Sequence, residues 1–338
     1  MMKHKHSVTK TTSTLSVSVF LLIGMSLVPS RSVGQAIGNG GFEQQREGIK
    51  DVEITTDCTK KLDDFFANPT ASGAVLQNPV ALRLRYRRYS SEQMLAMARA
   101  LGINAQASVL ERSHGFAIED SSANKRLAHD VRNGMILFSG HNKLPSDIPT
   151  KMFGTLEAQS NQIMRGLIGE RAEEYVNINS GSIIAMDAPN QNPRTLGRTY
   201  HFARKICGRV IRGKEGSASI TVGADGQPQN LFICDPDAEP IAPGQTLSRS
   251  QIEEKMRDFA KAHQDIEYKD KKLKIIGRIA SDAFPTYCME KRSTGDYLIP
   301  CVSIEIDNAL EDGGSAQTIL DISLDPDSKE GVIESRQF

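Results

Sequence analysis

Tryptophan is absent from this chain of 338 residues, and aromatic residues make up only 6% of it. Such a scarcity argues against a carbohydrate site built on stacked rings. An excess of charge is also missing, since 41 Lys and Arg residues face 41 Asp and Glu residues. Four of these bases and none of the acids lie in residues 1–36, so the remainder is mildly acidic. A general nucleic-acid binder has the opposite bias, and we expect no nucleic-acid partner.

The usual local markers of catalysis are missing as well. The sequence contains no His-Glu-x-x-His, no Gly-x-Ser-x-Gly, no phosphate-binding loop and no Cys-x-x-Cys. These patterns accompany metal-dependent hydrolysis, acyl transfer, nucleotide use and thiol exchange, respectively. The histidines beyond the leader are scattered, and we expect structural roles for His114, His129, His141, His201 and His263. We therefore predict a protein that is not an enzyme and that holds no metal and no cofactor.

The first residues predict export. A basic leader that includes Lys3 and Lys10 precedes an apolar run, Val17 to Val28, which is too short to span a bilayer comfortably. Small residues end at Ala36, so we expect a signal peptide over residues 1–36; the alternative is an uncleaved N-terminal anchor. No second run of membrane length follows, so we expect no transmembrane segment after cleavage. The predicted location is secreted or periplasmic.

Five cysteines lie beyond the leader, in a compartment where disulfides persist. Cys288 and Cys301 are placed symmetrically about Thr294-Gly295, which predicts a hairpin with a four-residue turn and the two cysteines directly opposed. Directly opposed cross-strand residues satisfy disulfide geometry, so we expect a bond. Cys207 and Cys234 are a second possible pair, and two reduced, buried thiols are the alternative for them. Cys58 would then be left over.

A ribbon pattern dominates residues 198–231. Alternating apolar residues on both sides of a glycine-rich bend predict antiparallel strands with one buried face. The pattern reads Tyr200-x-Phe202-x-Arg204-x-x-x-Gly208-x-x-Ile211-x-Gly213, then Ile220-x-Val222-x-x-Asp225-Gly226. It resembles the PepSY and fungalysin/thermolysin-propeptide-like modules of secreted bacterial proteins. The resemblance implies a helix paired with a curved sheet in a cystatin-like arrangement, and it implies inhibition or folding assistance of a protease.

Helical periodicity occurs three times ahead of strand patterns. Residues 91–101 follow the capping box Ser90-x-x-Gln93, residues 150–168 end at Gly169, and residues 250–263 open with Ser250-x-x-Glu253. Asn133-Gly134 between apolar runs predicts a hairpin. We therefore expect an α+β fold of repeated units, each a helix on a curved antiparallel sheet. The expected divisions are a signal peptide (1–36), an N-terminal extension (37–80), a helix-on-sheet module (81–145) and a PepSY-like domain of two helix-plus-sheet units (146–330).

Two surfaces are candidates for binding. Arg83, Arg85, Arg87 and Arg88 form a basic strip that could contact an anionic polymer or an acidic partner, although a solvated strand face is the more ordinary interpretation. An uncovered sheet edge could add an extended peptide as a further strand. The acidic segment Asp235 to Pro240 could offer oxygens to calcium, but its two prolines favour a solvated linker.

We therefore predict an exported, non-enzymatic binding protein that modulates or inhibits a protease or another exported partner. The alternative is a structural, envelope-associated protein that binds an anionic cell-surface polymer through the basic strip. The oligomeric state is open at this stage.

Overall fold

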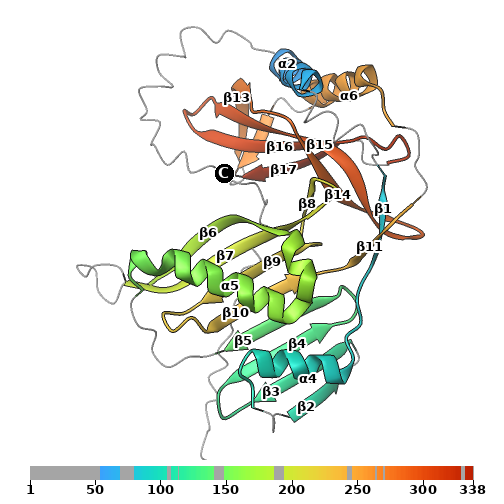
Figure 1. Cartoon of the computed structure of the whole chain (residues 1–338). Helices are drawn as coiled ribbons and strands as arrows, with labels where there is room; N and C mark the ends of the chain where they lie inside the picture. The colour runs from blue at the N-terminus through green and yellow to red at the C-terminus, as the bar shows by residue number, and fades with distance from the viewer. Residues whose placement is uncertain are drawn as a thin grey trace, which may run out of the picture.

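Strands dominate the computed structural model (Figure 1), which describes residues 54–68, 80–104, 108–112, 114–140, 148–185, 194–241, 246–262, 265–268, 271–328 and 332–337. Within these residues, seventeen strands form one hydrogen-bonded network. Every strand pairing in this described part is antiparallel except that of β8 (Arg209–Arg212) with β14 (Phe284–Arg292). The predicted signal peptide and its cleavage point lie outside the described residues.

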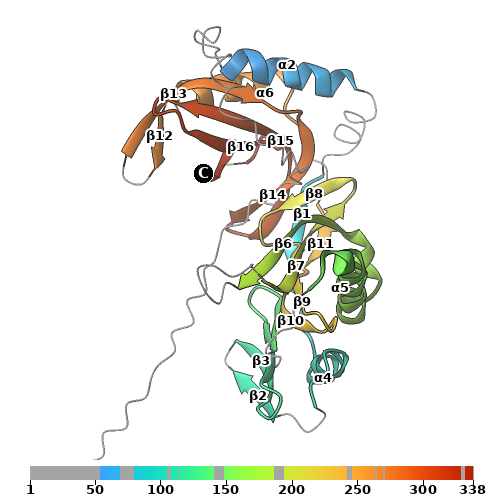
Figure 2. The same ribbon diagram turned by 90° about the vertical axis from the view of Figure 1, so that its left-hand side faces the viewer.

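The larger part of the network is an eight-stranded sheet. Its strands, in spatial order, are β2 (Ser108–Arg112), β3 (Gly115–Asp120), β4 (Lys125–Asp130), β5 (Met135–Gly140), β10 (Pro228–Cys234), β9 (Ser217–Val222), β7 (Arg194–Ile206) and β6 (Tyr175–Ala185). Helices α4 (Ser91–Ala100) and α5 (Phe153–Ile168) both cover the same face, as Figure 2 shows. A single apolar core lies between them and the strands, with Met94, Leu156, Met164, Phe202 and Ile220 buried in it.

The smaller part is a five-stranded sheet. Its order is β12 (Asp265–Tyr268), β13 (Lys271–Ala280), β15 (Gly295–Leu310), β16 (Ser315–Ser323) and β17 (Val332–Gln337). Helices α2 (Ile54–Ala67) and α6 (Arg249–Ala262) lie together over one face of it (Figures 1 and 2). Val302, Ile304 and Ile306 alternate along β15, point to that side and pack with Leu62 and Met256. Residues from the predicted extension thus contribute to this core.

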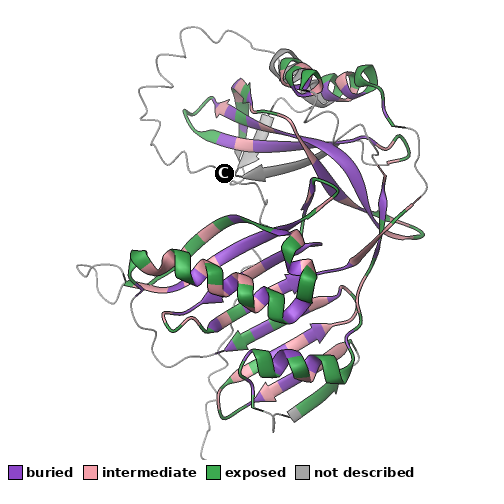
Figure 3. Cartoon of the chain, viewed as in Figure 1, coloured by how far each residue is buried: buried purple, intermediate pink, exposed green. Residues whose placement is uncertain are grey.

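Four strands connect the two sheets. β1 (Leu82–Arg85) pairs with β11 (Asp237–Pro240) and with β15, while β8 pairs with the end of β7 and with β14. β14 in turn pairs along the first half of β15. The junction is well buried, and Figure 3 shows a long run of buried residues along β15. The two sheets are therefore linked by backbone hydrogen bonds.

The prediction of an α+β fold of repeated helix-plus-sheet modules is wrong. The described chain is mostly one large mixed β network with only four α-helices, and α4 and α5 share one sheet and one core. The pairing of β5 with β10 joins segments on both sides of the predicted boundary at residues 145 and 146. Hydrophobic periodicity identifies single helices and strands, but it does not identify which distant strand pairs with each strand. Each helix followed by strands therefore looked like a separate unit in the sequence.

Several local predictions are confirmed. The Ser90 side chain accepts a hydrogen bond from the Gln93 amide at 3.2 Å, and the Gln93 side chain accepts one from the Ser90 amide at 2.9 Å. The Asn133-Gly134 turn joins β4 to β5, and the Asp225-Gly226 turn lies between β9 and β10. The cap of α6 differs from the prediction, because Ser248 and Gln251 make its reciprocal hydrogen bonds. This cap begins two residues before the one predicted at Ser250.

Candidate binding face

One face of the eight-stranded sheet carries no helix among the described residues. Side chains alternate along each strand, so Leu231 and Ile233 of β10 enter the core beneath the helices, whereas Asn230 and Phe232 point to the opposite side. The same alternation on β5 buries Ile136 and leaves Leu137 40% exposed. We call this helix-free side the open face.

Two parallel rows of side chains cross the open face. The strand registers place Ala117, Ala128, Leu137, Phe232 and Ser219 side by side in a largely apolar row. A second row, two residues further along each strand, is polar and consists of Glu119, Arg126, Ser139, Asn230, Thr221 and Thr199. Cross-strand neighbours lie about 4.5–5.5 Å apart, so each row is a continuous strip. The open face therefore offers apolar contact beside hydrogen-bonding groups.

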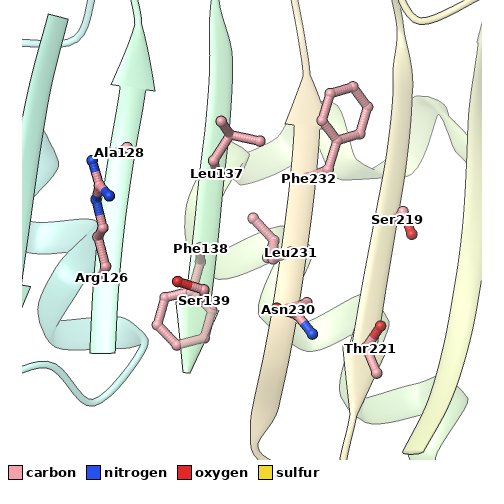
Figure 4. A pocket seen from close by; sticks show the side chains of 10 residues that line it. All are labelled: Arg126, Ala128, Leu137, Phe138, Ser139, Ser219, Thr221, Asn230, Leu231 and Phe232. Carbon is pink, nitrogen blue, oxygen red and sulfur yellow. The ribbon is translucent and has the colours of Figure 1, made fainter. Parts of the chain in front are cut away.

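The two rows border a hollow of about 340 Å³. Figure 4 shows it across β4, β5, β10 and β9, with Leu137 and Phe232 on neighbouring strands. The side chains around it are apolar, hydroxyl, amide and guanidinium groups, from Arg126, Ala128, Leu137, Phe138, Ser139, Ser219, Thr221, Asn230, Leu231 and Phe232. The hollow falls within the size range of known ligand sites. None of these described lining residues supplies a carboxylate, thiol or imidazole, so this chemistry suits binding.

Polar groups on the open face are held by one another. Arg126 Nε lies 3.2 Å from a Glu119 carboxylate oxygen, and the Thr199 and Thr221 hydroxyls lie 2.9 Å apart. His201 lies beside Ser219 in the apolar row and is 9% exposed, and burial lowers its pKa. Its imidazole is therefore held in the neutral form more strongly than a free histidine. These contacts orient Arg126, Thr199 and Thr221 on the open face.

The predicted basic strip lies at the junction of the two sheets. Arg85 forms an ion pair with Glu239 at 2.8 Å, Arg87 with Asp237 at 2.9 Å, and Arg83 donates to the Thr294 carbonyl at 3.0 Å. Arg88 is exposed. β1 lies between β11 and β15, so Arg83 and Arg85 are not on an edge strand, and Arg87 and Arg88 follow the end of β1. Much of its positive charge is therefore balanced within the chain.

The acidic segment after β10 differs from a solvated linker. Asp235 is 1% exposed and receives Arg171 Nη2 at 3.1 Å, with Arg204 Nη1 at 3.5 Å. The Tyr175 hydroxyl donates to the same carboxylate at 3.1 Å. Residues Asp237–Pro240 form β11. The segment ties the eight-stranded sheet to the junction, and its carboxylates are occupied by cations of the chain itself.

The described cysteines, Cys207, Cys234, Cys288 and Cys301, are free thiols in the structure. The predicted direct opposition of Cys288 and Cys301 is wrong, because Cys288 lies opposite Ile299 and Cys301 opposite Thr286. The turn holds two residues, since Arg292 pairs with Gly295, and this shifts the register by two. The two cysteines are thus diagonal neighbours. Two causes raise the pKa of the Cys288 thiol: the larger is a hydrogen bond with Cys301, and the next is burial.

The predicted pair Cys207 and Cys234 is also unbonded in the structure. Cys207 is exposed at the turn between β7 and β8, while Cys234 is buried and its Sγ lies 3.4 Å from the Asn133 carbonyl oxygen. Burial raises the pKa of Cys234 to about 12, so its thiol stays protonated. The side chain of Cys58 lies outside the described set. No cluster of three or more His, Cys, Asp or Glu side chains suited to a metal occurs in the described part of the chain.

The reverse side of β14, β15 and β16 holds a buried polar cluster. Arg212 Nη1 lies 3.2 Å from an Asp321 carboxylate oxygen, and the Ser303 hydroxyl donates to that carboxylate. Thr286 and Ser303 hydroxyls are 2.6 Å apart. Burial raises the pKa of Asp321, while Arg212 and the hydrogen bonds act in the opposite direction. The cluster is closed to solvent and stabilises the sheet junction.

Sequence reasoning missed the open face. Its signal was available in the alternation of β5 and β10, where Leu137 and Phe232 fall out of phase with the buried residues. The pairing of these two strands, which are about ninety residues apart, is what brings Leu137 opposite Phe232.

Comparison with known proteins identifies no relative: no family model matches the chain, and no curated protein matches it significantly. Neither comparison identifies a PepSY module. Among the helices that the structure describes, none is long and apolar enough to cross a membrane.

Proposed function

We propose that this chain is an exported, non-enzymatic binding protein that holds a partner protein on its open face, with an exported protease as the first candidate partner. The observation that carries the proposal is the hollow of about 340 Å³ bordered by Leu137 and Phe232 on one row and by Arg126 and Asn230 on the other. Binding sites combine an apolar floor with a few placed polar groups. Export is inferred from the basic leader and the apolar run that follows it.

Two features favour a protein partner over an anionic polymer. Three of the four arginines that a polymer would need at the predicted basic strip, Arg85, Arg87 and Arg83, are engaged with Glu239, Asp237 and the Thr294 carbonyl, respectively. The open face, in contrast, presents Leu137, which is 40% exposed, beside the half-buried Phe232 and Ala128 on neighbouring strands, and grouped apolar surface marks interaction sites. An extended partner segment lying along the two rows would meet apolar and hydrogen-bonding groups together.

The test measures protein-degrading activity in the exported fraction of the source organism, with and without the purified chain. Wild-type protein should change this activity, and the purified chain should form a complex with the affected protease. Phe232→Asp places a charge in the hollow and should abolish both effects. Ile279→Asp is the matched control, because Ile279 is 44% exposed on β13, away from the open face. Equal effects of Phe232→Asp and wild-type protein would contradict the proposal.

A further inference from the structure

β6 is an unpaired edge of the eight-stranded sheet. It runs for 11 residues, pairs with β7 along one side, and has no partner strand on its other side among the described residues. An edge of this kind presents a row of backbone donors and acceptors that another chain can use. The length of β6 matters because a longer edge strand can form more backbone hydrogen bonds with a second strand.

The other edge strands carry the usual protection against such pairing, and β6 does not. Edge strands are commonly blunted by charge, by proline or by short length. The remaining edges contain Glu111 and Arg112 in β2, Asp237, Glu239 and Pro240 in β11, Asp265 and Glu267 in β12, and Glu334 and Arg336 in β17. The sequence of β6, Tyr-Val-Asn-Ile-Asn-Ser-Gly-Ser-Ile-Ile-Ala, has no charged residue and no proline. β6 is also the longest of these strands.

Apolar side chains are exposed along the same strand. Val176 is 39% exposed, Ile183 41% and Ile184 59%. The register against β7 shifts at Ile178 and again after Ile183, where β7 holds the extra residue, so β6 itself is regular from Asn179 to Ala185. This regular segment combines small residues, Ser180 to Ser182, with two exposed isoleucines. Small residues let a second backbone approach closely.

We propose that β6 is a self-association edge, at which two copies of this chain pair antiparallel about a two-fold axis at Ser182. In that register Ser182 faces its own copy, Gly181 faces Ile183, and Ser180 faces Ile184. Such a contact is isologous, since each side supplies the same surface. Ile183 of one copy reaches Ile183 of the other diagonally across the axis.

The absence of charged residues from β6 favours a second copy of this chain as the partner at this edge. Like charges placed opposite one another destabilise paired strands, and β6 has none, so two copies meet without repulsion. A partner recognised through its charge would gain nothing from this strand. The pairing also sets the open faces of the two copies on one continuous sheet, because β6 belongs to the sheet that carries the hollow.

The mass of the purified protein in solution tests self-association. Light scattering after size exclusion should give twice the monomer mass, and dilution should shift it toward the monomer. Ile184→Lys should give the monomer mass at all concentrations, while Ile279→Lys, a lysine at another exposed isoleucine, on β13, should leave the dimer intact. Circular dichroism checks that both variants fold. A monomeric wild type, or a dimer that survives Ile184→Lys, overturns the proposal.

Cross-linking tests the register. In a Cys207→Ser background, which removes the exposed thiol among the described cysteines, Ser182→Cys should form an intermolecular disulfide under mild oxidation, because directly opposed cross-strand residues meet disulfide geometry. Ser180→Cys is the matched control, since Ser180 and Ser182 both bond to Arg198 and Ser180 faces Ile184 in the proposed register. Peptide mapping identifies the linked residue. Linkage through residue 180, and none through residue 182, overturns the register.

Discussion

Both sheets carry helices on one face, but their second faces differ. Beside β8 and β14 the second face of the smaller sheet is buried and polar, with Arg212 and Ser303 both bonded to Asp321. Behind β5 and β10 the second face is open, with Leu137 and Phe232 bordering a hollow. A buried ion pair is costly to disturb, whereas an exposed apolar side chain contributes little to folding. The first face therefore stabilises the chain, and the second is free to bind.

The largest effect should come from the buried polar face. Asp321→Ala leaves the guanidinium of Arg212 buried without its carboxylate, and we expect a loss of about 3–5 kcal/mol in the free energy of unfolding. Asp321→Asn keeps an acceptor for Ser303 and should lose less. Urea unfolding followed by circular dichroism measures both. A loss below about 1 kcal/mol for Asp321→Ala would show that this face does not stabilise the junction.

Neighbouring residues of β5 should separate the two faces of the eight-stranded sheet. Ile136→Ala removes a fully buried side chain and should cost about 2–5 kcal/mol. Leu137→Ala removes a side chain that is 40% exposed, and we expect a change within about 0.5 kcal/mol. Denaturant midpoints of the two variants check this difference. Equal losses would mean that the open face is packed as tightly as the helix-covered face.

The stability of the chain should also depend on pH, because His129 is buried on the helix-covered face of the eight-stranded sheet. His129 is 2% exposed, and burial lowers its pKa below the ordinary histidine value of 6.5. Its Nε2 lies 3.2 Å from the Arg87 carbonyl oxygen, which fits a neutral ring that donates this bond. The unfolded chain binds the proton first, so stability present above pH 6.5 should fall as the pH drops toward the folded pKa. His129→Gln should reduce this fall in stability, measured as urea midpoints between pH 7 and pH 5. An unchanged pH dependence of the urea midpoint in His129→Gln would contradict this role of His129.

Local elements of this fold could be predicted because their causes are local. The Ser90-x-x-Gln93 cap, the Asn133-Gly134 turn and the inward face of Val302, Ile304 and Ile306 depend on a few adjacent residues. The hairpin register at Cys288 was mispredicted by two residues because a two-residue and a four-residue turn fit the same symmetric sequence.

The sheet arrangement and the open face could not be predicted in the same way. The decisive pairings are β5 with β10, β8 with β14, and β1 with β11 and β15, which join segments far apart in the chain. No local pattern encodes these partners, because each edge strand can satisfy its hydrogen bonds with many others. The hollow depends on the first of these pairings, so it became visible only with the structure.

Two adjacent residues of β10 test the central claim most directly, because Phe232 borders the hollow and Ile233 is fully buried beneath the helices. Unfolding free energy and the effect on the partner protease should be measured on Phe232→Asp and Ile233→Asp prepared side by side. We expect Phe232→Asp to stay within about 1 kcal/mol of wild type and to lose the partner effect, while Ile233→Asp fails to fold because it buries an unpaired charge. A folded Phe232→Asp protein that still acts on the partner as wild type does would contradict the account.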